Sequence, residues 1–292
     1  MIQSNPKLQS KPPILKTQSY SYQDVISYLD NNWISPITSL APFKKIILDI
    51  NKELLSIPSV IIAGTSGKTI TSHFLTILLK KEKIKTGAFC SPHFTAYNEQ
   101  VSIDGKLISN KNFTTHATTL LNKSAQQKHT LHSHELLMGI MLLHSFEQKV
   151  RFIILEQKNL DQLDPAQLLT PRIIGITRLA SDEVDTLQAF NSILKTATPT
   201  TFIVSADQSK TNLQELCIAV KLKKAEWLMP IRKIAPLPYP YEQLHGRCAT
   251  LAERIASTYI AHFTTPLKDE VSLLHKPKKQ RGRPTLEIKE QE

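Results

Sequence analysis

The sequence predicts an α/β fold, in which a mostly parallel sheet carries helices on both faces. Three observations support this prediction. Short β-branched runs that are typical of buried strands recur along the chain, and the first is residues 60–62, "VII". Segments with apolar residues at helical spacing separate these runs. The first run passes through a glycine-containing loop into a helical segment, and ligands of such sheets bind at the carboxyl ends of the strands.

The expected elements alternate along the chain. We expect strands where β-branched residues form short runs, and helices where apolar residues recur every three or four positions. The expected strands are 60–62, 86–90, 152–155, 173–177 and 201–204. The expected helices are 22–33, 71–81, 113–121, 134–146, 186–195, 213–222 and 246–263. A hairpin is expected over 101–108, because Asp104-Gly105 is a typical turn pair.

Composition separates one folded region from two polar ends. Residues 1–17 are polar and rich in Pro and Lys, so we expect a disordered arm. Residues 18–266 contain all of the expected strands and helices. Residues 267–292 become polar and then strongly basic, and we expect them to form a disordered tail or a linker. With 41% apolar residues, the chain can bury a core.

Two features of the sequence bear on the compartment. It has no run of 18 apolar residues and no apolar stretch near the start, so we expect neither a membrane span nor a secretory signal. Cys90, Cys217 and Cys248 are odd in number and lack the spacing of a metal site. This pattern favours a reducing compartment, so we expect a cytoplasmic protein in which each cysteine is a small core residue.

A net charge of +11 suits an anionic ligand, such as a nucleotide or a nucleic acid. Residues 276–284, "KPKKQRGRP", resemble an AT-hook, in which Arg-Gly-Arg lies in a narrow minor groove. A basic disordered linker is the simpler explanation of one such segment. Nucleic acid is therefore not the expected partner.

The most informative segment is 59–72, "SVIIAGTSGKTITS". A strand, a glycine-containing loop and a helix in this order form a phosphate-binding loop, because backbone N–H groups and the helix N-terminus meet at one point. Lys68 would neutralise the β- and γ-phosphates, and Thr69 would offer its hydroxyl to Mg²⁺. The loop has two residues between its glycines, where a full P-loop has four, so a simple turn is the alternative. The expected nucleotide-binding residues are Gly64, Thr65, Ser66, Gly67, Lys68 and Thr69.

Several segments in order resemble the folylpolyglutamate synthase/dihydrofolate synthase family of the Mur ligase superfamily. They are "SYQDVISYL" (21–29), "VIIAGTSGKT" (60–69), "SPHFTAYNEQVSIDGKLIS" (91–109), "HELLMGIMLL" (134–143), "FIILE" (152–156) and "IIGIT" (173–177). The resemblance implies that residues 18–266 form the N-terminal and central ATP-binding domain, of P-loop type. It also implies that ATP and Mg²⁺ activate a folate-type carboxylate as an acyl phosphate, which the amine of glutamate then attacks.

The resemblance also implies roles for single residues. It makes Lys68 and Glu156 the expected catalytic residues, and it makes Ser91 and Glu156 ligands of Mg²⁺. Hard oxygen ligands suit this ion, and Glu156 stands at the carboxyl end of an expected buried strand. Without the resemblance, Ser91 would be read as a turn residue before Pro92, and Glu156 as a solvated strand end.

Five polar residues are expected to have structural roles. His93 is expected to orient its loop, and Asn98 and Glu99 are expected to cap the strand that follows. His132 and His134 stand two residues apart at the start of a helix, which is poor spacing for one metal site. We therefore expect loop and capping roles for both.

The sequence departs from the family pattern beside the expected site. Residues 157–164, "QKNLDQLD", replace a Gly-Leu-Gly-Gly-Arg-Leu-Asp-type loop, and they lack the glycines that permit close backbone approach. Glu183 stands in place of a metal-binding His, and we expect it to ligate Mg²⁺ instead. Leu194 stands in place of a lysine, and Lys195 follows about 100° further around the helix.

The departures leave two functions open. The first is an ATP-dependent ligase of the folylpolyglutamate synthase type. The second is a degenerate or truncated nucleotide-binding module without ligase activity. Family members have a further C-terminal domain that closes over ATP, and we expect it to have no counterpart after residue 266.

Overall fold

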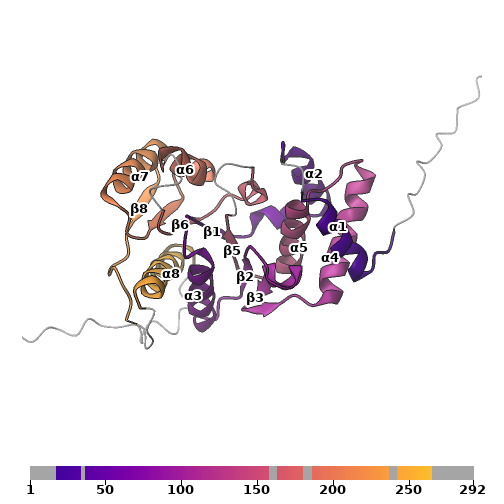
Figure 1. The fold of residues 1–292 in the computed structure, drawn as a ribbon, viewed down its shortest axis with the longest axis horizontal. Helices are drawn as coiled ribbons and strands as arrows, with labels where there is room; N and C mark the ends of the chain where they lie inside the picture. Colours follow the sequence, from indigo (N-terminus) through magenta and orange to yellow (C-terminus); the bar gives the residue numbers. More distant parts are fainter. Residues whose placement is uncertain (1–17, 34–36, 158–162, 180–185, 237–241, 265–292) are drawn as a thin grey trace, which may run out of the picture.

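The computed structural model describes residues 18–33, 37–157, 163–179, 186–236 and 242–264 (Figure 1). These residues contain an eight-stranded sheet of order β4-β3-β2-β5-β1-β6-β7-β8. All pairs from β2 to β8 along this order are parallel, and β3 and β4 add an antiparallel edge. The strands are β1 (Ser59–Ala63), β2 (Thr86–Phe89), β3 (Val101–Ile103), β4 (Lys106–Leu107), β5 (Phe152–Glu156), β6 (Ile173–Ile176), β7 (Phe202–Ser205) and β8 (Glu226–Leu228).

Helices cover both faces of this sheet (Figure 1). One face packs on α3 and α8, and the opposite face packs on α5, α6 and α7, while α1, α2 and α4 lie outside α5. The helices are α1 (Tyr22–Asn31), α2 (Ala41–Ile50), α3 (Lys68–Lys81), α4 (Asn110–Gln126), α5 (Ser133–Glu147), α6 (Thr186–Ile193), α7 (Lys210–Lys223) and α8 (Glu242–Phe263). Four short 3₁₀ turns are η1 (Lys52–Ser56), η2 (Tyr97–Gln100), η3 (Pro165–Leu168) and η4 (Leu194–Thr196).

The central strand β1 explains why both faces are covered. Successive side chains of a strand point to opposite faces of the sheet. Val60 and Ile62 lie in the core beneath α3 and α8, whereas Ile61 and Ala63 lie in the core on the other face, and all four are buried. A strand that is buried at every position therefore needs helices on both faces, and the predicted fold class is confirmed.

The predicted elements are all present among the described residues, and some extend further than predicted. Helix α3 begins at Lys68 rather than at residue 71, and α8 begins at Glu242 rather than at residue 246. The hairpin turn has Asp104 at φ 50° and Gly105 at φ 79°, as a turn of this kind requires. Helix α2 and the three-residue edge strand β8 were not predicted.

Some sequence predictions concern residues outside the described ranges. These are the disordered arm, the basic tail with its AT-hook-like segment, and the metal ligand Glu183. They remain predictions. Among the described helices, none combines the length and the apolar character needed to cross a membrane.

Candidate active site

The phosphate-binding loop lies between the carboxyl end of β1 and the start of α3. Gly64 has φ 123°, and a Cβ at this position would lie 2.2 Å from Oγ1 of Thr177. Gly67 is the N-cap of α3 with φ 89°, and its Cβ would lie 2.7 Å from Sγ of Cys248. Both positions therefore require glycine, for conformation and for space. The loop is held between the end of β6 and the side of α8.

Backbone hydrogen bonds attach the loop to the neighbouring strand. The N–H groups of Thr65 and Ser66 point at the carbonyl of Arg178, with N···O distances of 3.2 and 3.5 Å. On the other side, Thr177 Oγ1 donates to the carbonyl of Ala63 at 3.1 Å. These two amides are therefore engaged within the protein. The amides in the first turn of α3 remain for a ligand, because they have no acceptor within their own helix.

Lys68 folds back over the loop that precedes it. Its Nζ donates to the carbonyl of Gly64 at 2.7 Å, and the side chain is half-buried. Burial lowers the pKa of Lys68, and the negative charge of Glu156 partly opposes this effect. The ammonium group thus lies at the loop and beside a carboxylate, where it could exchange a carbonyl oxygen for a phosphate oxygen.

Glu156, the last residue of β5, is 1% exposed and lies beside the loop. Its Oε2 accepts a hydrogen bond from Thr69 Oγ1 at 3.0 Å and lies 3.5 Å from the amide nitrogen of Ser91. Its Oε1 is buried, and no donor among the described residues has hydrogen-bond geometry to it. Such an oxygen is costly to bury unless a cation or a donor compensates it.

These groups fit a magnesium site. Two groups are hard oxygen ligands, which Mg²⁺ prefers: the hydroxyl of Thr69, and the Glu156 oxygen that has no partner among the described residues. The backbone nitrogen of Ser91 lies 3.5 Å from the other oxygen of Glu156. The structure brings Lys68, Thr69, Ser91 and Glu156 together at one end of the sheet, and their roles in catalysis and metal binding remain predictions. The third predicted ligand, Glu183, lies outside the described residues.

Two cysteines lie at this site. The Cys90 thiol is beside Glu156, and burial together with the charge of Glu156 raises the pKa of Cys90 well above its usual value. Cys248 packs against Gly67, and burial raises its pKa as well. Both thiols therefore remain neutral. Cys248 is a small buried residue, as predicted, whereas Cys90 and Cys217 are only partly buried. The sequence did not indicate that Cys248 lies against the loop or that Cys90 lies beside Glu156.

The segment after Ser91 is organised by its own polar side chains. His93 Nδ1 lies 2.8 Å from Nε2 of Gln100, and the His93 ring is 4.2 Å from the ring of Tyr97. The Glu99 carboxylate accepts from the N–H groups of residues 94, 95 and 96. Asn98 Nδ2 donates to the carbonyl of Ile108 at 2.9 Å. These residues hold the loop in place, which confirms the expected role of His93. Glu99 caps this loop rather than the strand that follows.

The two histidines before α5 differ from each other. His132 is the N-cap of α5, and its Nδ1 accepts from the N–H of His134 at 3.1 Å, as predicted. His134 is not a capping residue. Its ring is buried in the first turn, and its Nε2 lies 3.4 Å from Oδ1 of Asp164.

Some of the residues at which the sequence departs from the family pattern lie within the described ranges. Asp164 is buried and accepts from the N–H of Ala166 at 2.8 Å, whereas residues 158–162 lie outside the described ranges. Leu194 is fully buried in the core, and Lys195 is exposed. The apolar residue at the family's lysine position therefore has a structural role here.

Sequence reasoning missed a residue after β7 that positions the loop. Gln208 Nε2 donates to the carbonyl of Thr177 at 2.9 Å, and its Oε1 accepts from the N–H of Leu179 at 3.0 Å. Gln208 thereby fixes the backbone to which Thr65 and Ser66 are bonded. The available signal was its position just after the strand that ends at Ser205, at the ligand-binding edge of the sheet.

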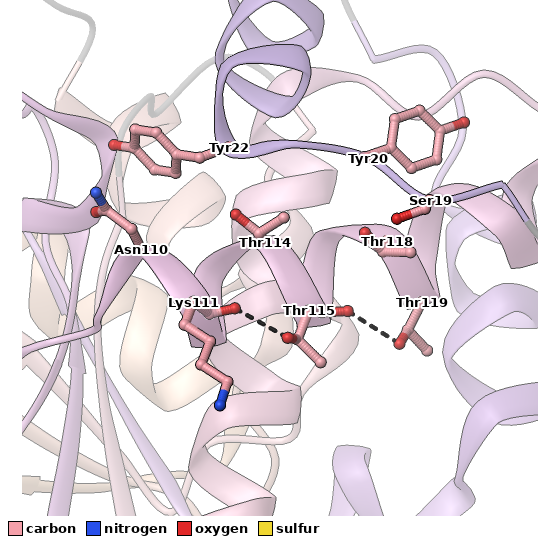
Figure 2. Close-up of a pocket in the computed structure, with 9 residues that line it drawn as sticks. All are labelled: Ser19, Tyr20, Tyr22, Asn110, Lys111, Thr114, Thr115, Thr118 and Thr119. Atoms are coloured by element: carbon pink, nitrogen blue, oxygen red, sulfur yellow. Dashed lines mark hydrogen bonds between the residues drawn. The ribbon is translucent and has the colours of Figure 1, made fainter.

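A concave surface lies between the N-terminal segment and α4, with a volume of about 500 Å³ (Figure 2). Threonines from α4 form much of its floor. The hydroxyls of Thr115 and Thr119 donate to the carbonyls of Lys111 and Thr115 in their own helix, at 2.9 and 3.1 Å. This surface shares no residue with the phosphate-binding loop.

Comparisons with known proteins agree with this geometry. No family model matches the chain. It is 25% identical to the mitochondrial folylpolyglutamate synthase of Bos taurus over 234 residues, which are 70% of this chain and 40% of that protein. It is 24% identical to the dihydrofolate synthase/folylpolyglutamate synthase of Bacillus subtilis over 246 residues, which are 80% of this chain and 54% of that protein. The chain therefore spans about half the length of these relatives.

Solved structures show the same fold. The folylpolyglutamate synthase of Mycobacterium tuberculosis in complex with ADP superposes with a TM-score of 0.71 at 20% identity, over 82% of this chain and 61% of that chain. An FPGS–AMPPCP complex superposes with a TM-score of 0.72 at 14% identity, over 83% of this chain and 67% of that chain. Sequence and fold together make the chain a divergent relative of the folylpolyglutamate synthase/dihydrofolate synthase family, with the Mur ligase fold of those enzymes.

Proposed function

We propose that the chain binds MgATP at the loop 64–69, with Mg²⁺ held by Thr69, Ser91 and Glu156. The observation that carries this proposal is the buried Oε1 of Glu156, which has no hydrogen-bond partner among the described residues. The same carboxylate accepts from the Thr69 hydroxyl through Oε2 and lies near the Lys68 ammonium group. A buried carboxylate is costly without a compensating positive charge, and a bound cation would supply that charge. The ADP and AMPPCP complexes of the structural relatives support a nucleotide as the ligand.

Each residue would have a distinct task in binding. Lys68 leaves the Gly64 carbonyl and neutralises phosphate oxygens, while the amides at the start of α3 donate to them. Glu156 and the Thr69 hydroxyl stay at the metal side of the phosphates. Bound Mg²⁺ would supply further positive charge to the β- and γ-phosphates.

We further propose ligation of glutamate to a folate-type carboxylate as the reaction. The acceptor carboxylate attacks the γ-phosphorus of ATP, the bond to ADP breaks, and an acyl phosphate forms. The glutamate amine then attacks the acyl carbon, loses a proton and displaces phosphate. Lys68 would stabilise the charge on the transferred group, which is the main protein contribution in phosphoryl transfer.

The second candidate is nucleotide binding without ligation, and two observations favour it. Leu194 is buried where the family has a lysine, so this position offers no amino group. The segment that follows Glu156 also lacks the glycines of the family. Phosphate release that depends on both folate and glutamate would support the ligase, whereas MgATP binding without such turnover would support the binding module.

Calorimetric titration with ATP, with and without Mg²⁺, tests the site itself. We expect Lys68→Ala to weaken binding at least about tenfold in both conditions, because it removes a charge-assisted contact. Glu156→Gln should remove only the gain in affinity that Mg²⁺ provides. Lys81→Ala, at the exposed far end of the same helix, is the matched control and should bind as the wild type does. Equal binding by all four proteins would refute the proposed site.

A further inference from the structure

Two histidines and a glutamate converge between α4 and α5. Nε2 of His116 lies 3.4 Å from Nδ1 of His144 and 3.2 Å from Oε2 of Glu147. Each of the three residues offers one possible ligand atom, and these atoms all lie within 4.8 Å of one another. His144 and Glu147 are three residues apart on α5, so they share one face of that helix, and His116 faces them from α4.

These distances match those of a metal site. In a tetrahedral zinc site with metal–ligand bonds of about 2.0–2.2 Å, neighbouring ligand atoms are about 3.3 Å apart. Two of the three separations, 3.4 and 3.2 Å, lie close to this value, and the third is at most 4.8 Å. A neutral His116 Nε2 can carry one hydrogen at most, so it cannot donate a separate hydrogen bond to both the His144 ring and the Glu147 carboxylate.

The environment of the imidazoles suits metal binding. Both rings are buried, at 9% and 6% exposure, and burial lowers the pKa of His116 and of His144. Neutral imidazoles retain the lone pair that a metal needs. The Glu147 side chain is 57% exposed, which leaves room for a water molecule as a fourth ligand. Lys85 lies near His144, and its positive charge disfavours a cation there.

We propose that His116, His144 and Glu147 bind a zinc-type divalent cation that links α4 to α5. Two nitrogen donors and one carboxylate favour Zn²⁺ and similar transition metals over Mg²⁺. Helix α5 ends at Glu147 just before β5 begins, so this cluster lies near the amino ends of the strands. The phosphate-binding loop lies at their carboxyl ends, so the two sites are separate.

Titration of the full chain with Zn²⁺, followed by calorimetry and thermal unfolding, tests the proposal. We expect one Zn²⁺ per chain, a higher melting temperature with Zn²⁺, and no competition from excess Mg²⁺. His116→Gln, His144→Gln and Glu147→Gln should each weaken binding at least about tenfold, since each removes a ligand. His73→Gln removes an exposed histidine on α3 and should bind as the wild type does.

Cobalt provides a readout of the ligands themselves. Co²⁺ in the same site should give the intense visible absorption of a four-coordinate ion, and Glu147→Gln should change this spectrum. Glu147 is exposed, so its substitution tests the site even where a buried histidine variant fails to fold. The proposal is overturned if the wild type binds no stoichiometric Zn²⁺, or if all three ligand variants bind it as tightly as the wild type.

Discussion

Single residues at the phosphate-binding loop are constrained by conformation and by space at once. Gly64 and Gly67 combine positive φ angles with neighbours that leave no room for a Cβ. Gly105 has a similar φ of 79° in the β3–β4 hairpin, yet no atom lies within 4 Å of its Cβ position. A side chain at Gly105 would meet backbone strain alone, whereas a side chain at Gly64 or Gly67 would meet both backbone strain and a steric clash.

This difference leads to a paired prediction. Gly105→Ala should destabilise the protein by about 1–2 kcal/mol, because an L-residue is strained at positive φ. Gly67→Ala should cost at least about 1 kcal/mol more, because its Cβ also overpacks against Cys248. Urea denaturation of both variants measures the difference. Equal losses of stability would show that the contact with Cys248 relaxes without cost.

At the scale of elements, polar side chains hold segments that lack regular structure. The loop 91–97 leads from β2 into η2, and Glu99 fastens it through three backbone N–H groups and the Thr95 hydroxyl. These hydrogen bonds, with that of Thr95 the largest, lower the pKa of Glu99 from 4.5 to about 2. Ionised Glu99 is thus bound more strongly in the folded protein than in the unfolded chain.

The lowered pKa predicts a dependence of stability on pH. A carboxyl group whose pKa falls on folding contributes stability above its unfolded pKa, and this contribution disappears as the pH falls. The wild type should therefore be more stable than Glu99→Gln at pH 7, and the difference should shrink between pH 4.5 and about 2. Urea denaturation across this range measures it. A difference that persists unchanged at pH 2 would contradict the assignment.

Short elements show the limit of pattern reasoning at this scale. The segment 41–50 has Phe43, Ile46 and Ile47 buried at helical spacing, so the pattern of this helix is present in the sequence. By contrast, β8 has only three residues and none is fully buried. Its strand conformation depends on pairing with β7, and no local signal of three residues specifies such a partner.

At the scale of the whole molecule, α8 connects the sheet to the loop. Cys248 from this helix abuts Gly67, and Ile255 lies over β6. A Cβ on Gly175 of β6 would lie 2.6 Å from Cδ1 of Ile255 and 2.9 Å from Cδ1 of Ile62. The close approach of helix and sheet therefore depends on a glycine in a central strand.

A double-mutant cycle tests this packing. Gly175→Ala should destabilise by about 1–3 kcal/mol through overpacking. Ile255→Val removes the Cδ1 atom and should cost about 0.5–1.5 kcal/mol alone. Together the two changes should cost at least about 0.5 kcal/mol less than their sum, because the Val side chain makes room for the new methyl group. Additive losses in urea denaturation would argue against direct contact.

The sequence by itself determined the α/β class, the order of the main strands and helices, and the loop 64–69 at the end of the first strand. These features are local, because hydrophobic periodicity and a strand–loop–helix order are visible within a dozen residues. The sequence also singled out Ser91 and Glu156, through resemblance rather than through pattern.

Only the tertiary structure decided which distant residues meet. It placed Cys90 beside Glu156, Cys248 against Gly67, and His116 next to His144 and Glu147. It also made Leu194 a core residue and left Lys195 exposed. Such contacts join residues from separate helices and strands. They depend on how the layers pack, and a one-dimensional pattern contains no information on which faces of two helices oppose each other.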